Sequence, residues 1–114
     1  MKFEIICDDL KMGEKLMNDF SRIAEEEYSK NIKKTLKRVE ILRKIGIVRP
    51  DFFIPEEVIF LVEREEDRII ISNSLPTPIL MKIGKRPIKK MEENIRKFLE
   101  SNGVKVFEVR YVGD

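Results

Sequence analysis

The stretch VIFLVEREEDRIIIS, residues 58–72, decides the expected fold. Two runs rich in β-branched and other apolar residues, 58–63 and 68–72, flank the charged segment 64–67, which predicts a β-hairpin with a tight turn. Both runs are apolar at consecutive positions, so both faces of the hairpin are expected to be covered. A second subunit is the more economical cover, and the chain's own long helix or the segment 52–54 is the alternative.

A strand and a very long helix are expected before the hairpin. Residues 2–7 alternate as a strand does, and apolar residues then recur at helical spacing over residues 10–45, up to Gly46. An unbroken helix of that length would measure about 54 Å, whereas a chain of this size forms a globule roughly 35 Å across. We expect the helix either to break near residues 29–31 or to project and need a partner for its apolar stripe.

A second helix and a last strand are expected after the hairpin. Segment 46–57 predicts a connection, residues 79–83 a short edge strand, and residues 87–102 a helix that Gly103 ends before a strand over 104–112.

The order βα-ββ-αβ predicts one α+β domain over residues 1–114. Its expected form is a ferredoxin-like split βαβ sandwich with an unusually long first helix. A winged helix with the hairpin as its wing is the minor alternative, because phosphates would repel the acidic tip of that wing.

Composition excludes several classes of function. The chain has 114 residues with 23 basic and 21 acidic side chains, so a net charge of +2 does not mark a general polyanion binder. Histidine is absent, which removes histidine triads and histidine-bound zinc. Abundant isoleucine, lysine and glutamate predict a thermophilic source. The lone cysteine and the lack of a leader-like or membrane-spanning run predict a cytoplasmic protein.

Two features near the end of the first strand have side chains that could carry chemistry. Asp8 and Asp9 follow that strand, where carboxylates hold Mg²⁺ in many enzymes, but helix capping explains them better because no further ligands converge. Cys7 has no histidine as a base, so a buried structural thiol is expected. We therefore predict no catalytic residues, no metal and no cofactor.

Basic residues form the alternative site. A cluster lies around the start of the last helix, where cations oppose the helix dipole and stability alone does not predict them. Lys33 and Lys37 belong to a second basic stripe within residues 30–44 that could follow a phosphate backbone. The cluster comprises Lys82, Lys85, Arg86, Lys89 and Lys90.

The leading hypothesis is a noncatalytic interaction module that forms a homo-oligomer, with a dimer favoured, or binds another protein. Nucleic-acid or phosphorylated-ligand binding through the basic residues is the alternative. The expected interface residues are Val58, Phe60, Val62, Ile70, Leu36 and Val39.

Overall fold

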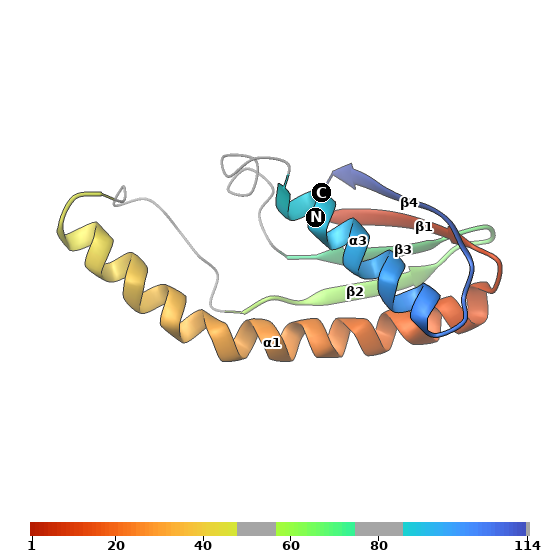
Figure 1. Ribbon diagram of the computed structural model, residues 1–114, viewed down its shortest axis with the longest axis horizontal. Helices are drawn as coiled ribbons and strands as arrows, with labels where there is room; N and C mark the ends of the chain where they lie inside the picture. The colour runs from red at the N-terminus through yellow and green to blue at the C-terminus, as the bar shows by residue number, and fades with distance from the viewer. Residues whose placement is uncertain (48–56, 75–85, 114) are drawn as a thin grey trace.

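The elements alternate between one sheet and two helices along the chain (Figure 1). The computed structural model describes residues 1–47, 57–74 and 86–113. The predicted connection within 46–57 and the edge strand at 79–83 therefore lie wholly or largely outside the described residues. The elements are β1 (Lys2–Cys7), α1 (Leu10–Lys44), β2 (Phe60–Arg64), β3 (Ile69–Asn73), α3 (Arg86–Ser101) and β4 (Val106–Gly113).

The sheet is antiparallel throughout, with the strand order β2-β3-β1-β4. On the central strand, Phe3 lies between Ile71 of β3 and Tyr111 of β4. The α+β class, the sheet with two helices and the long first helix are confirmed. Because β3 pairs with β1, the hairpin lies within the sheet and is not a separate wing.

The hydrophobic core lies between one face of the sheet and both helices. Alternate strand residues such as Phe3, Ile5 and Ile71 are fully buried there, as period-two alternation requires. Met17 of α1 and Leu99 of α3 are equally buried against them. Each buried side chain of this size contributes about 1.5–3 kcal/mol, so this layer is the main source of stability.

Helix α1 lies unusually close to the sheet near its start. Asp9 caps the helix, its Oδ1 accepting from the Met12 N–H at 3.0 Å. One turn on, Gly13 is buried, and a Cβ there would lie 2.6 Å from Ile69 Cδ1 and 3.0 Å from Cys7 Sγ. Only glycine allows this approach without displacing those side chains.

Helix α1 then continues without a break for 35 residues, so of the two expected alternatives the break near residues 29–31 is wrong. Side chains of Ser29 and Asn31 bond back to carbonyl oxygens four residues earlier, at 2.9 Å each, and such bonds bend a helix without ending it. Figure 1 shows the helix axis turning in its second half. The long axis of the molecule is 51 Å, and its radius of gyration is 15.8 Å, above the ~13 Å of a compact chain of this length.

Both helices also bond the two edge strands of the sheet. Glu25 of α1 accepts from the N–H of Phe60 on β2 at 2.8 Å. Glu92 of α3 accepts from the N–H of Tyr111 on β4 at 3.2 Å, and Arg96 donates to the carbonyl of Val106 at 3.3 Å. These side chains satisfy backbone groups that an edge strand otherwise presents to other chains.

The opposite face of the sheet carries an ion-pair network. Glu4 on β1 lies between Arg110 at 2.6 Å and Arg68 at 3.2 Å, so one carboxylate links β1 with β4 and with the residue that precedes β3. The hydrogen bond from Arg110, then that from Arg68, lowers the pKa of Glu4 against the opposing effect of burial. Ile70 is buried on this face, opposite Glu4 in the register.

Candidate functional site

The second half of α1, defined here as residues 28–45 with the C-cap Ile45 included, is largely exposed. Figure 1 shows it extending beyond the end of the sheet. Ile41 and Ile45 are 61% and 62% exposed, and Leu36 and Val39 are half-buried. Large apolar side chains at this exposure on a projecting helix are typical of a surface that another molecule covers.

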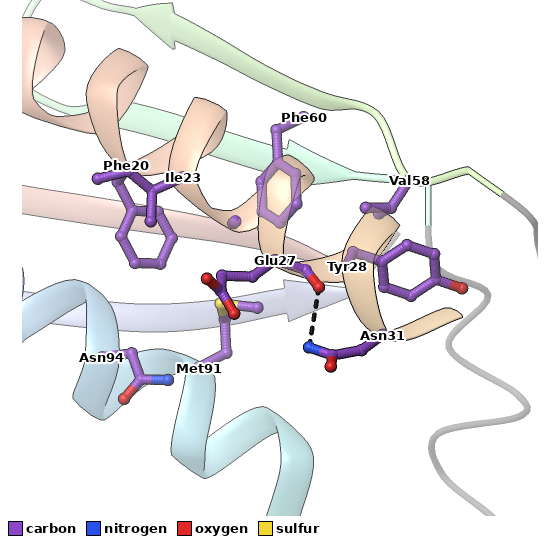
Figure 2. A pocket seen from close by; sticks show the side chains of 10 residues that line it. Phe20, Ile23, Glu27, Tyr28, Asn31, Val58, Phe60, Met91 and Asn94 are labelled. Carbon is purple, nitrogen blue, oxygen red and sulfur yellow. Dashed lines mark hydrogen bonds between the residues drawn. The ribbon is translucent and has the colours of Figure 1, made fainter. Parts of the chain in front are cut away.

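An apolar groove lies beside the middle of α1, with a volume of about 400 Å³. Figure 2 shows the side chains around it, which come from α1, from the segment that enters β2, and from α3. Phe20 is part of its lining, and the centroid of its ring lies 6.5 Å from that of Phe60 and 5.5 Å from that of Phe98. The lining residues are Phe20, Ile23, Ala24, Glu27, Tyr28, Asn31, Val58, Phe60, Met91 and Asn94.

The few polar groups around this groove lie on two helices. The Asn31 side chain donates to the carbonyl oxygen of Glu27 at 2.9 Å, which Figure 2 shows as a dashed line. Ile23 is 51% exposed beside them. Burial raises the pKa of the Tyr28 phenol, so the ring is neutral at physiological pH. An apolar floor with few polar groups suits an apolar side chain better than a charged metabolite.

The expected interface residues divide among three places. Val58 and Phe60 line the groove, and Val62 packs against the core. Leu36 and Val39 lie on the second half of α1, whereas Ile70 lies on the opposite face of the sheet. Helix α1 of the same chain covers the inner face of the hairpin, as the alternative explanation of its apolar pattern required.

The basic residues are only partly described. Lys33 and Lys37 are exposed on α1, and Lys89 and Lys90 are exposed in the first turns of α3. Lys82 and Lys85 lie outside the described residues, as does the side chain of Arg86. The described basic residues therefore come from two different helices, α1 and α3.

The two aspartates after β1 are both engaged in backbone hydrogen bonds. Asp8 Oδ1 accepts from the N–H of Lys105 at 3.0 Å, which ties the end of β1 to the start of β4. Asp9 caps α1. Within residues 1–47, 57–74 and 86–113, no group of three or more acidic or cysteine side chains is placed to hold a metal ion.

Cys7 is buried beneath these aspartates. Its Sγ donates to the carbonyl oxygen of Asp9 at 3.5 Å. Burial, with the charges of Asp8 and Asp9 adding to it, raises the pKa of the thiol although the hydrogen bond opposes this. The protonated, buried thiol is a poor nucleophile.

Known proteins offer no guide, because no family model, curated protein or solved structure matches this chain. The described helices contain no segment long and apolar enough to cross a membrane. The groove and the exposed isoleucine at Ile23 were missed by sequence reasoning, because three distant segments form the groove. The exposure of Ile41 and Ile45 was indicated by the sequence, because the predicted helix is longer than a globular domain of this size.

Proposed function

We propose that this chain is a noncatalytic interaction module that assembles with a second copy of itself or with another protein. The observation that carries the proposal is the second half of α1, which extends past the sheet with Ile41 and Ile45 exposed. Covering an isoleucine side chain fully is worth about 1.5–3 kcal/mol. Binding through these residues would therefore have a substantial driving force.

The length of α1 supports the same proposal. Helices that lack tertiary contacts are marginal in water, even at lengths of about 12–15 residues. The second half of α1 has some cover, because Ile32 is buried, but its last turns carry exposed isoleucines. A partner that covers them would stabilise the helix and gain binding energy from it.

We also infer a ferredoxin-like split βαβ sandwich as the framework of this module. The element order βα-ββ-αβ and the sheet order β2-β3-β1-β4 support it. Such sandwiches serve unrelated functions, so the framework itself does not select one.

The test is the mass of the protein in solution by light scattering over a range of concentrations. Wild type is expected to exceed the monomer mass as concentration rises, and Ile41→Asp, Ile45→Asp to stay monomeric. Ser29→Asp, Thr35→Asp is the matched control, because it adds the same charge at exposed polar positions of the same helix half. A wild type that is monomeric throughout would rule out self-assembly and leave only a different protein as the partner.

Anion binding is the second candidate function. The second half of α1 carries seven basic residues and one acidic residue, Glu40. Their dense positive charge could follow a phosphate backbone. Helix-dipole matching accounts for cations near the end of a helix as well, and so assembly remains the leading proposal.

Fluorescence anisotropy with single- and double-stranded oligonucleotides tests this candidate. Binding that weakens steeply with salt and is lost in Lys33→Glu, Lys37→Glu would support it. The control Lys89→Glu, Lys90→Glu separates the α1 stripe from the α3 lysines. Undetectable binding at low salt would contradict the candidate.

A further inference from the structure

Three exposed isoleucines lie on one stripe of α1. Ile23 and Ile41 are separated by about five helical turns, so they share one angular position on the helix, and Ile45 follows one turn later. Ile23 lines the groove, whereas Ile41 and Ile45 lie on the second half of α1. One end of the stripe therefore lies in an apolar groove, and the other end carries apolar side chains that protrude from the molecule.

The charges beside these isoleucines have opposite signs at the two ends. Next to Ile23 are the exposed carboxylates Glu26 and Glu27. Next to Ile41 are the exposed cations Lys37 and Arg38. In the described part of the chain none of these four side chains forms an ion pair. Opposite charges at the two ends of one helix fit a second helix that runs in the opposite direction.

We propose that the partner is a second copy of this chain, lying antiparallel along α1 about a two-fold axis at the level of residue 32, on the exposed face that carries Lys30 and Lys34. The proposal rests on the proposed function. In this arrangement Ile23 faces Ile41 of the second copy, and Glu26 and Glu27 face its Arg38 and Lys37. The symmetry repeats every contact, as an isologous dimer requires.

The groove is the place where the end of α1 from the second copy binds in this dimer. Ile41 of the second copy lies over the apolar lining that contains Ile23, between α1 and α3, and Ile45 lies one turn further along, opposite Asp19. The volume of about 400 Å³ is large enough for such side chains. Each protomer thus supplies one groove and one protruding helix end, which explains why both features occur on the same chain.

The charge balance of the arrangement is favourable overall. Lys30 faces Lys34 of the second copy near the axis, which gives two repulsive pairs. The carboxylates and cations beside the isoleucines give four attractive pairs. Exposed pairs are weak individually and are screened by salt. The isoleucines therefore hold the dimer, and the charges select the antiparallel orientation.

A charge-swap experiment tests this orientation. Variant one is Glu26→Lys, Glu27→Lys, and variant two is Lys37→Glu, Arg38→Glu. Each variant alone turns all four attractive pairs into like-charge pairs, so dimerisation measured by sedimentation equilibrium at low salt is expected to weaken roughly tenfold or more. Mixing the two variants makes every one of these contacts attractive again, so a mixed dimer is expected, and the fourfold variant should dimerise like wild type.

The possible outcomes separate this inference from the proposed function. If wild type dimerises through Ile41 and Ile45 but the mixture does not form mixed dimers, the antiparallel pairing is wrong and the interaction module stands. If wild type is monomeric at every concentration, self-association itself is wrong. Circular dichroism checks the helix in each variant, and the mixing step does not depend on how stable either variant is alone, provided both are folded.

Discussion

The two halves of α1 belong to one helix but have different surroundings. In the first half, Leu16 and Met17 are buried against the sheet, and Gly13 allows the close approach. In the second half, Ile41 and Ile45 face solvent. The first half is therefore held by the core of its own chain, whereas the second half leaves large apolar side chains uncovered.

The largest difference is expected from truncating one apolar side chain in each half. Met17→Ala should lower the free energy of unfolding by about 2–5 kcal/mol, because it leaves a cavity in the core. Ile41→Ala should change it by less than about 0.5 kcal/mol at low protein concentration, because the side chain is exposed. Urea unfolding of both variants measures these changes in the free energy of unfolding. Equal losses of stability in the two variants would contradict the division of α1 into a half packed on the core and an exposed half.

A smaller effect is expected from placing alanine at one position in each half. Gly13→Ala gains about 1 kcal/mol of helix propensity but forces Ile69 and Cys7 aside, an overpacking that costs about 1–3 kcal/mol. A net loss of about 1 kcal/mol is expected. Ser29→Ala lies in the second half with nothing to displace, and should stabilise by a few tenths of a kcal/mol. Thermal unfolding compares the two, and a stabilised Gly13→Ala would show that the close approach is not needed.

The smallest effect is expected from neighbouring carboxylates at the boundary between the halves. Glu25 accepts from the Phe60 N–H, whereas Glu26 is exposed without a described bond. Glu25→Ala should therefore cost about 1 kcal/mol, and Glu26→Ala should stay within about 0.5 kcal/mol at concentrations where the protein is monomeric. Chemical denaturation measures the free energy of unfolding of both variants. An equal change in the two would show that the Glu25 hydrogen bond does not stabilise the edge strand β2.

Sequence reasoning recovered the elements better than their assembly. The bounds of the first strand were predicted correctly, and the hairpin strands to within about two residues, because alternation and turn residues are local signals. The continuity of α1 was not decided, because low helix propensity near Ser29 and Asn31 competes with side-chain bonds to the helix backbone.

The close approach at Gly13 and the groove depend on contacts between distant segments. Gly13 had one usable signal, a glycine inside an amphipathic helix, since such a residue lowers helix stability unless packing requires it. The groove had none, because Val58 and Met91 join Phe20 there only in the folded chain. The consecutive apolar residues of the hairpin are accounted for in part by α1, which covers the inner face of its two strands.

Amide hydrogen exchange along α1, measured in dilute and in concentrated solution, tests the central claim most directly. We expect the amides of residues 13–24 to be strongly protected at both concentrations, whereas those of residues 33–45 gain protection as the protein concentration rises. Protection that is the same at both concentrations in the second half of α1 would contradict self-association through this part of the helix.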